Sequence, residues 1–228
     1  MHEDGRVSTQ ETLSVDQAVA RAVALAEAGG RSVVGIAGAP GAGKSTLARR
    51  VVTEVTDRLG AGVAVQVPMD GFHLANTALD ALGRRDRKGA IDTFDAAGYV
   101  ALVRRLTAAD GTGGTDGTGS TVWAPDFDRR VDEPVAGSIA VPPETVLVVS
   151  EGNYLLDRTA PWRELPGLFT ETWACVVDDS VRIDRLVGRH MRHGRDHEGA
   201  RRWAVEVDGA NAVRVTADLH RASVLVRT

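Results

Sequence analysis

The stretch Gly38-Ala39-Pro40-Gly41-Ala42-Gly43-Lys44-Ser45-Thr46 decides the fold of this chain. It matches the pattern G-x-x-x-x-G-K-[ST], in which the backbone N–H groups of a glycine-rich loop and a helix N-terminus surround a phosphate group. An apolar run over 33–37 precedes the loop and predicts a buried strand. Apolar residues at every fourth position follow it and predict a helix: Leu47, Val51, Val55 and Leu59. This order favours a phosphate-binding loop over a glycine-rich turn that contains Gly-Lys-Ser by coincidence.

Two side chains of the loop have distinct expected roles. Lys44 is expected to neutralise the β- and γ-phosphates of a nucleotide, and the Ser45 hydroxyl to bind Mg²⁺. Of the 27 Lys and Arg residues in the chain, only Lys44 and Lys88 are lysines. A compact ammonium suits a phosphate better than a planar guanidinium does at this position. We therefore expect the whole loop, 38–46, to bind the nucleotide.

Composition and charge indicate a globular protein with its own core. The chain has 228 residues, 43% of them hydrophobic, which suits one domain over 1–228. A net charge of −4 argues against a nucleic-acid scaffold, and no apolar run is long enough to span a membrane. The single cysteine, Cys175, excludes an intramolecular disulfide, and the acidic first residues do not resemble a signal peptide. A cytoplasmic location is expected.

Apolar strands alternate with helices along the rest of the chain. The polar residues 1–12 are expected to be loose, and a capping box at 14–17 predicts a helix over 13–28. After the strand–loop–helix unit over 31–60, further strands are expected over 63–69, 145–149, 173–177 and 224–226. Such strands are typical of a parallel sheet covered on both faces. The expected fold class is α/β, a three-layer α/β/α P-loop NTPase fold with a mainly parallel sheet and a helical lid.

Two stretches are expected to lie outside this sheet. The first is an insertion over 74–141, which begins with irregular residues 74–94 and a helix from Asp95 to Leu106. It continues with a low-complexity Gly/Thr/Asp loop over 109–121 and with short strands over 121–124 and 137–141 that flank 125–129. The second is a lid region over 181–209, with helices over 181–193 and 197–208.

Two carboxylates follow predicted strands. Asp70 comes after the strand over 63–69 and precedes Gly71 and Phe72, and Glu151 comes after the strand over 145–149. The carboxyl ends of parallel strands meet at one edge of the sheet, where the glycine-rich loop also lies. There, Asp70 is expected to accept a proton from a hydroxyl group, and Glu151 to orient Mg²⁺ or its water. The simple alternatives are a loop-capping aspartate and a strand-end glutamate without a metal role.

The helix over 181–193 carries a basic stripe. Its arginines are three or four residues apart and share one face: Arg182, Arg185, Arg189 and Arg192. A solvated basic face is the simple interpretation. A lid that closes over a nucleotide needs arginines near the phosphates, and Arg189, Arg192 and Arg195 have suitable spacing. A lid is therefore the functional hypothesis.

Taken together, these stretches resemble the P-loop superfamily of uridine kinase, pantothenate kinase and phosphoribulokinase. Within it, the chain is most similar to bacterial nucleoside/nucleotide kinase-like proteins and fructose-transport-system kinases. The resemblance runs from about residue 31 to the C-terminus. Its carriers are GAPGAGKST (38–46), MDGFHL (69–74), RKGAIDTFD (87–95), PDFDRRVDEPV (125–135), EGNYLL (151–156), RLVGRHMRHGR (185–195) and DGANA (208–212). Ile91 departs from the superfamily pattern, which has proline there.

The resemblance implies an ATP- and Mg²⁺-dependent kinase for a small-molecule acceptor such as a sugar, a nucleoside or a pantothenate-like metabolite. It implies that Asp70 is the catalytic base and that Glu151 assists Mg²⁺. It implies lid roles for Arg189 and Arg195 and a position near the adenine for Asn211. Arg192 is expected at the nucleotide from the spacing of the basic stripe. The residues expected to contact the acceptor are Phe72, His73, Lys88, Phe94, Phe127, Arg129 and Tyr154. Acceptor pockets differ within the superfamily, so the resemblance does not name the acceptor.

Two other functions stay open. A P-loop switch or metallochaperone-type ATPase or GTPase would act on a protein partner. A guanine-specific member should carry an Asn/Thr-Lys-x-Asp motif, and neither lysine of this chain lies in one; the Ser-Gly-Gly signature of ABC-type ATPases is also missing. A nucleotide-binding regulatory module without turnover requires that Asp70 is not catalytic. The expected partner is a small-molecule acceptor. Binding to nucleic acid or to a membrane is not expected, and a homodimer is possible.

Overall fold

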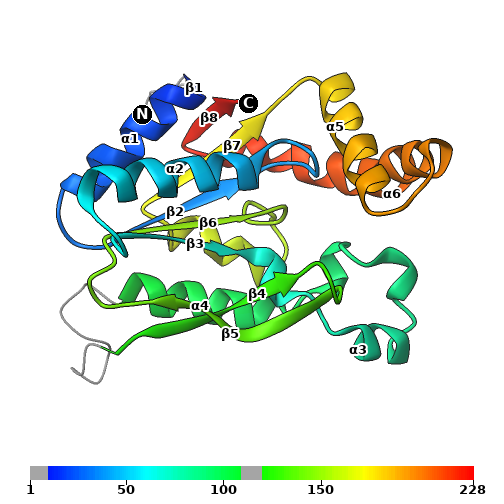
Figure 1. Ribbon diagram of the computed structural model, residues 1–228, viewed down its shortest axis with the longest axis horizontal. Coiled ribbons are helices and arrows are strands. Elements are labelled where there is room, and N and C mark those ends of the chain that lie inside the picture. The colour runs from blue at the N-terminus through cyan, green and yellow to red at the C-terminus, as the bar shows by residue number, and fades with distance from the viewer. Residues whose placement is uncertain (1–9, 109–119) are drawn as a thin grey trace, which may run out of the picture.

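The computed structural model describes residues 10–108 and 120–228 (Figure 1). Residues 1–9, predicted to be loose, and residues 109–119 of the predicted low-complexity loop lie outside this description.

A six-stranded parallel sheet forms the centre of the molecule, in the order β1-β8-β7-β2-β6-β3. Its strands are β1 (Glu11–Ser14), β2 (Ser32–Ala37), β3 (Ala64–Pro68), β6 (Leu147–Gly152), β7 (Glu171–Val176) and β8 (Val224–Arg227). Five of them confirm the predicted strands, although β6 extends through Glu151. Strand β1 was missed, because its residues were assigned to a loose segment and to the start of a helix. Only Leu13 is buried in β1, so the strand has no apolar pattern of its own and depends on its pairing with β8.

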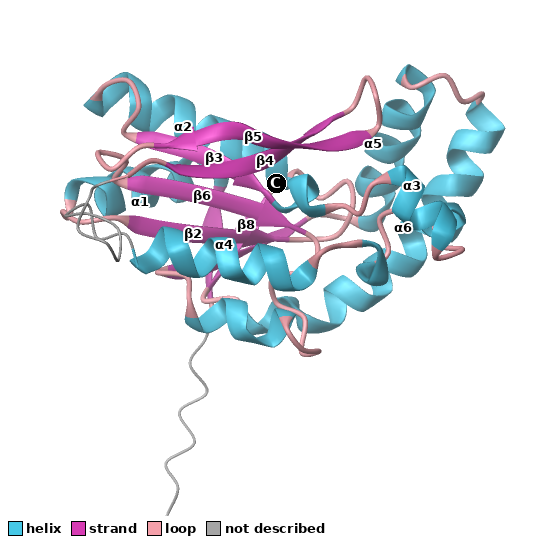
Figure 2. Cartoon of the chain, turned by 90° about the horizontal axis from the view of Figure 1, so that it is seen from below, coloured by secondary structure: helices cyan, strands magenta, loops and turns pink. Residues whose placement is uncertain are grey.

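Helices cover both faces of this sheet (Figures 1 and 2). Helices α1 (Val15–Glu27) and α2 (Lys44–Leu59) share one hydrophobic core with Val34 of β2. Helix α4 (Ala96–Ala108) belongs to the core on the other face, which includes Val33 of the same strand. Neighbouring residues of β2 thus point to opposite cores, as the pleat of a strand requires. The predicted three-layer α/β/α fold is confirmed.

Local capping signals place the starts of two helices as predicted. The Ser14 hydroxyl accepts a hydrogen bond from the Gln17 N–H at 3.2 Å, and the Gln17 side chain accepts one from the Ser14 N–H at 2.8 Å. This reciprocal capping box starts α1. Before α4, the Asp95 carboxylate accepts from the Gly98 N–H at 2.9 Å. Both helices therefore begin where a side chain satisfies a free backbone donor.

The insertion between β3 and β6 is more regular than predicted. A short helix, α3 (Asn76–Ala81), lies in the stretch expected to be irregular, together with 3-10 turns at Arg85–Arg87 and Ile91–Thr93. Strands β4 (Val122–Asp128) and β5 (Glu133–Val141) form a separate antiparallel hairpin.

The prediction of two short strands that flank 125–129 is wrong, since residues 125–128 belong to β4. The register shifts between Ala124 and Asp126, so that Pro125, which has no N–H to donate, sits at the irregularity. Pairing with β5 then resumes, with Asp126 opposite Val135. The hairpin also packs directly on the turn that follows β3: a Cβ atom added to Gly71 would lie 2.4 Å from the Pro125 carbonyl oxygen. Glycine at 71 therefore permits this close contact.

Helices α5 (Asp179–Arg192) and α6 (His197–Asp218) form a pair at the right of Figure 1. A small core of Leu186, Val187, Ala200 and Ala204 joins them. The predicted end of the second helix at residue 208 is wrong, because α6 continues to Asp218 through Gly209. A glycine inside a helix costs about 1 kcal/mol. Burial of Ala212 and Val215 farther along the helix offsets this cost, and Val215 joins the α4-side core.

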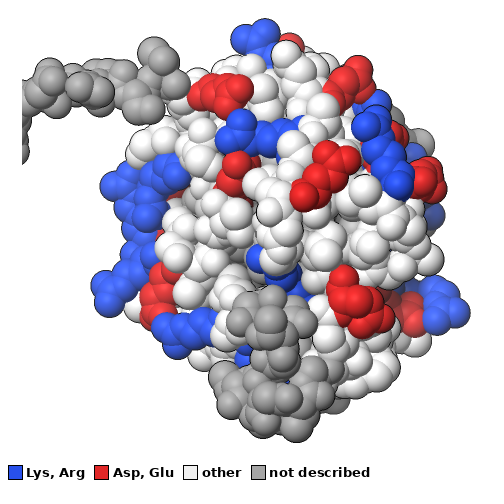
Figure 3. All heavy atoms as spheres, turned by 90° about the vertical axis from the view of Figure 1, so that its left-hand side faces the viewer, with Lys and Arg blue, Asp and Glu red and all other residues white. Residues whose placement is uncertain are grey.

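The opposite end of the molecule has a mixed surface. Where its described residues are visible in Figure 3, acidic and basic side chains are interspersed across a largely uncharged area. A surface of mixed sign does not create the extended positive potential that attracts a polyanion. Within residues 10–108 and 120–228, no helix has both the length and the apolar character of a membrane span.

Candidate active site

The glycine-rich loop lies between β2 and α2, at the carboxyl edge of the sheet. Gly41 and Gly43 have φ angles of 82° and 88°, a region that glycine adopts without steric cost. A Cβ atom at Gly41 would lie 2.8 Å from the Arg182 carbonyl oxygen and 2.9 Å from the side chain of Leu186. Both neighbours belong to α5. The glycine at 41 therefore shapes the loop and lets α5 pack against it.

Lys44 is the first residue of α2 and is only 8% exposed. Its Nζ donates to the Ala39 carbonyl at 3.1 Å and to Oδ1 of Asn153 at 2.8 Å. Burial lowers the pKa of Lys44, whereas nearby Glu151 raises it. The ammonium thus has two neutral hydrogen-bond partners inside a loop suited to an anion. A phosphate oxygen is a stronger partner for this charge than either of them.

The Ser45 hydroxyl donates to Oε1 of Glu151 at 2.8 Å. Glu151 is 6% exposed and lies in β6, between β2 and β3. Burial, followed by repulsion from Asp70, raises the pKa of Glu151, and Lys44 opposes this shift. The pair offers two hard oxygen ligands of the kind that Mg²⁺ prefers.

No group of three or more His, Cys, Asp or Glu side chains in the described parts of the chain could hold a metal ion. A cation at Ser45 and Glu151 would therefore complete its coordination with phosphate oxygens and water. Mg²⁺ is usually bound in this way, through one or two carboxylates and the phosphates of a substrate. The oxygen donors present fit that ion.

Asp70 lies in the 3-10 turn Met69–Phe72, directly after β3. Its Oδ2 accepts a hydrogen bond from Nη2 of Arg129 at 3.0 Å, across 59 positions of sequence. The side chains of Asp70 and Arg129 are 33% and 56% exposed. Oδ1 of Asp70 receives no hydrogen bond from any described residue, so one carboxylate oxygen is available. A loop-capping aspartate would instead accept from a nearby backbone N–H.

Beside Asp70 lies a group of side chains that we call the aromatic–cationic cluster: His73, Lys88, Phe94, Phe127 and Arg129. The His73 ring centroid is 4.1 Å from that of Phe94 and 4.8 Å from that of Phe127. Nζ of Lys88 lies 4.9 Å, and the guanidinium carbon of Arg129 5.8 Å, from the Phe127 centroid. The structure thus brings five of the seven predicted acceptor contacts together.

The remaining two predicted acceptor contacts have structural partners. The Phe72 ring packs edge-on against Tyr99 at a centroid distance of 5.3 Å. Tyr154 is 1% exposed; its hydroxyl donates to the Gly89 carbonyl at 2.8 Å and lies 3.2 Å from Oδ1 of Asn211. Asn211, predicted near the adenine, therefore lies in α6 beside Tyr154.

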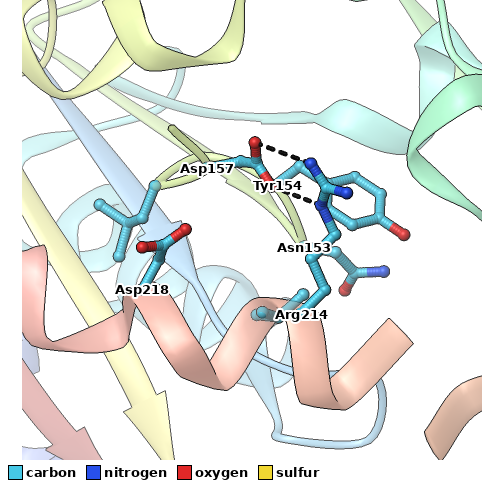
Figure 4. A pocket seen from close by; sticks show the side chains of 7 residues that line it. Asn153, Tyr154, Asp157, Arg214 and Asp218 are labelled. Carbon is cyan, nitrogen blue, oxygen red and sulfur yellow. Dashed lines mark hydrogen bonds and ion pairs between the residues drawn. The ribbon is translucent and has the colours of Figure 1, made fainter. Parts of the chain in front are cut away.

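The loop after β6 connects this region to α6 (Figure 4). Asn153, Tyr154 and Asp157 line a small pocket together with Arg214 and Asp218 of α6. Nε of Arg214 donates to Oδ2 of Asp157 at 2.6 Å. Asn153 also contacts Lys44, so one short loop touches both the phosphate-binding loop and α6. Asn153 was missed as a site residue, although its place two residues after Glu151 was a usable signal.

The arginines of the basic stripe have different environments. Arg182 is 5% exposed, with hydrogen bonds from Nε to Asp179 at 2.7 Å and from Nη1 to the Pro40 carbonyl at 3.3 Å. Arg182 therefore stabilises the phosphate-binding loop from α5. The interpretation of the stripe as a solvated basic face is wrong for Arg182. Arg185 also lies near the loop, since a Cβ atom added to Gly43 would be 3.5 Å from Nη1 of Arg185. Sequence spacing alone could not separate these two residues from the rest of the stripe.

The predicted lid arginines lie farther along the helix pair. Nη2 of Arg189 is 3.8 Å from Oδ1 of Asp208, and its charge contributes to the lowered pKa of Lys44. Arg192 is exposed. The guanidinium of Arg195 stacks over the Trp203 ring at 4.0 Å. Their role at a nucleotide stays a prediction.

Several known proteins are similar to this chain in sequence or in fold. A family model described as the methylmalonyl-CoA mutase-associated GTPase MeaB matches residues 7–110. A candidate uridine kinase of Schizosaccharomyces pombe is 33% identical over 193 residues, which cover 83% of this chain and 79% of that protein. The crystal structure of a candidate fructose transport system kinase from Silicibacter sp. TM1040 has 33% identity and a TM-score of 0.79, covering 93% of this chain and 98% of that one. YFH7 from Saccharomyces cerevisiae, at 16% identity, shares the fold with a TM-score of 0.82 over 95% of this chain and 99% of its own.

Proposed function

The chain belongs to the uridine kinase-like family of P-loop kinases, and we propose that it transfers the γ-phosphoryl group of ATP to a hydroxyl group of a small molecule. The acceptor class proposed is a sugar, a nucleoside or a pantothenate-like metabolite. One observation carries the proposal: Lys44, the Ser45–Glu151 pair and Asp70 converge at one edge of the sheet. Phosphoryl transfer needs these three elements, namely a phosphate-binding charge, a metal site and a proton acceptor.

The donor half of the proposed site is the glycine-rich loop with Lys44, Ser45 and Glu151. Backbone N–H groups of the loop and the N-terminus of α2 would bind the phosphates of ATP, and Lys44 would exchange Asn153 for a phosphate oxygen. Ser45 and Glu151 would hold Mg²⁺, which when bound neutralises charge on the phosphates. Helices α5 and α6 are the proposed lid, with Arg189, Arg192 and Arg195 as its cationic residues.

Asp70 is the proposed general base. The acceptor hydroxyl oxygen forms a bond to the γ-phosphorus while the bond from that phosphorus to the β–γ bridging oxygen breaks. ADP leaves, and the hydroxyl proton passes to Asp70. The accessible Oδ1 of Asp70 supports this role, since a base must lie within hydrogen-bond reach of the proton that it accepts. In the structure, Arg129 binds the other carboxylate oxygen, Oδ2.

A second candidate function is a nucleotide-dependent switch that acts on a protein partner. The match of residues 7–110 to the MeaB GTPase model favours it. That match includes the glycine-rich loop and Asp70 but neither Glu151 nor the α5–α6 pair. The missing Asn/Thr-Lys-x-Asp motif argues for adenine rather than guanine nucleotides. A kinase therefore remains the better-supported proposal.

A coupled nucleotide-consumption screen tests the choice. The full chain is incubated with Mg²⁺ and either ATP or GTP, together with pantothenate, nucleosides, hexoses or sugar acids. Acceptor-stimulated consumption of ATP, with the phosphorylated acceptor identified by mass spectrometry, supports the kinase. Hydrolysis that no acceptor stimulates, with GTP preferred over ATP, overturns it in favour of the switch.

A further inference from the structure

We propose that the acceptor carries an anionic group, a carboxylate or a phosphate, and that Arg129 releases Asp70 in order to bind it. This inference rests on the proposed kinase function and concerns the same site. It adds two properties to that function: the charge of the substrate, and a catalytic base that becomes free only when the substrate arrives.

The first argument is the arrangement of Arg129. Among the described residues, its only hydrogen bond is the one from Nη2 to Asp70, and its side chain is 56% exposed. A guanidinium has five N–H donors in a planar fork that matches both oxygens of a carboxylate or phosphate. Most of this fork is therefore free. The neighbouring Arg130 differs, since its Nε and Nη2 both bind Asp128, at 3.1 and 2.6 Å.

A second positive charge, that of Lys88, lies near the same aromatic ring as Arg129. Lys88 is 13% exposed in its side chain, and Nζ donates to Oδ1 of Asn76 at 2.7 Å and to Oδ2 of Asp132 at 2.8 Å. These contacts fix the ammonium in place beside the Phe127 ring, which Arg129 approaches as well. Nζ of Lys88 also donates to the Asp132 carbonyl at 2.5 Å, so all three of its donors are used. Lys88 therefore adds positive charge near the ring but no free donor, and Arg129 is the cation that can turn to bind an anion.

The third argument concerns His73. Its Nδ1 lies 2.8 Å from the Asp70 carbonyl oxygen, which can only accept, so Nδ1 carries the hydrogen. Burial lowers the pKa of His73, and the charges of Lys88 and Arg129 lower it further against an opposing effect of Asp70. The neutral ring leaves Nε2 as an acceptor without a partner among residues 10–108 and 120–228. It suits a hydroxyl donor, so the cluster fits a molecule with both hydroxyl and anionic groups.

The consequence concerns Asp70. A carboxylate that is paired with a guanidinium accepts a proton less readily than a free carboxylate. When the anionic group of the acceptor binds Arg129, Asp70 is freed to bind the acceptor hydroxyl. Without an acceptor, the ion pair stays closed and water is activated poorly. Arg129 would thus limit wasteful hydrolysis of ATP as well as select the substrate.

The test compares charged acceptors with their neutral counterparts in coupled ATP-consumption assays of the full chain. The sets are glycerate against glycerol, pantothenate against panthenol, and gluconate and glucose 6-phosphate against glucose. The last set separates carboxylate from phosphate recognition. Each set is measured on the wild type, Arg129→Gln, Arg129→Lys and Arg130→Gln. The exposed Arg130 is the matched control, since it binds Asp128 rather than Asp70.

We expect at least one anionic acceptor to exceed its neutral counterpart by about tenfold or more in kcat/KM, a preference that corresponds to about 1.4 kcal/mol. Arg129→Gln should remove most of this preference, Arg129→Lys should keep part of it, and Arg130→Gln should keep all of it. Neutral acceptors that work equally well, or a preference that survives in Arg129→Gln, overturn the inference while the kinase function stands.

Hydrolysis of ATP without an acceptor provides a second measurement. We expect Arg129→Gln to hydrolyse ATP several-fold faster than the wild type and Arg130→Gln to match the wild type. If no acceptor of either kind stimulates turnover, the kinase proposal fails. The hydrolysis rates then still test whether the ion pair with Arg129 keeps Asp70 from activating water. Equal hydrolysis rates in Arg129→Gln and the wild type would overturn the inference that Arg129 limits the activity of Asp70.

Discussion

The two halves of the proposed site are built in different ways. The donor half is compact in sequence, since nine consecutive residues supply most of it, and its charged groups Lys44 and Glu151 are 8% and 6% exposed. The acceptor half is assembled from separate segments, and its ion pair between Asp70 and Arg129 is substantially exposed. A buried charge is held by its surroundings, whereas an exposed pair can exchange partners at little cost. The donor half is therefore fixed and the acceptor half adjustable.

Lys44→Ala should have the largest effect, because it removes the one cation buried in the phosphate-binding loop. We expect kcat/KM for ATP to fall by about 10³-fold, the upper range for the loss of one preorganised group at a developing charge. The measurement is steady-state ATP consumption combined with calorimetric ATP binding. Lys88→Ala, at the only other lysine, is the control in the acceptor half and should retain ATP binding. Equal loss of ATP binding in both variants would contradict the division into halves.

Asp70→Asn should separate binding from chemistry. The amide keeps the size of the side chain but cannot accept the hydroxyl proton, so acceptor phosphorylation should fall by about 10²-fold or more. Affinity for ATP should change little, because the donor half is intact. Rapid-quench measurement of the phosphorylated acceptor, beside ATP titration, checks both. Asp86→Asn, at an exposed aspartate, is the matched control. A wild-type rate in Asp70→Asn would make Asp70 a structural residue.

Glu151→Gln should change the response to Mg²⁺ and to pH. Burial and then Asp70 raise the pKa of Glu151, so this carboxylate is protonated on acidification earlier than an exposed glutamate. In the wild type, the Mg²⁺ concentration for half-maximal activity should therefore rise as the pH falls. In Glu151→Gln it should be raised by about tenfold and depend less on pH. Activity titrations with Mg²⁺ at several pH values measure this, with the exposed Glu54→Gln as control.

The same variant has a predictable effect on stability. Because the folded-state pKa of Glu151 lies above its unfolded value, the folded chain binds the proton more tightly, and its stability decreases as the pH rises through that raised pKa. The neutral glutamine avoids this loss. Without nucleotide and Mg²⁺, Glu151→Gln should therefore have a higher Tm than the wild type at neutral pH. A lower Tm would show that the attraction between Lys44 and the Glu151 carboxylate outweighs the cost of the buried charge.

Tyr154→Phe should have the smallest effect. The Tyr154 hydroxyl lies between Gly89 in the acceptor half and Asn211 of α6, the residue predicted near the adenine. The variant loses the hydrogen bond to the Gly89 carbonyl, next to Lys88, and should decrease the free energy of unfolding by about 1 kcal/mol. We expect a several-fold higher KM for the acceptor and an unchanged KM for ATP. Urea unfolding and the two KM values measure this. An equal change in both KM values would place Tyr154 in the donor half as well.

Much of the fold followed from short-range patterns. The strand, loop and helix around the phosphate-binding loop, the capping box of α1 and the cap of α4 all depend on residues a few positions apart. Such signals act through local hydrogen bonds and apolar periodicity, so they can be read without the rest of the chain. The parallel sheet followed from the fully apolar strands.

Other features had no local signal. Strand β1 has one buried residue and exists through pairing with β8, more than two hundred positions away. Helix α6 passes Gly209 because its last turns pack against the sheet core. Arg182 looks like the other arginines of α5 in the sequence, yet it alone among the stripe is deeply buried against the phosphate-binding loop.

The sequence by itself determined the donor half, because nine adjacent residues contain the glycines, the lysine and the serine that are proposed to bind a phosphate and its metal ion. It also supplied Asp70 and Glu151 as candidates, since both follow apolar strands. Only the tertiary structure decided that Arg129 binds Asp70 across 59 positions and that Lys88 binds Asp132 across 44. Contacts over such distances depend on how the β4–β5 hairpin packs against Gly71, and no local pattern encodes that packing.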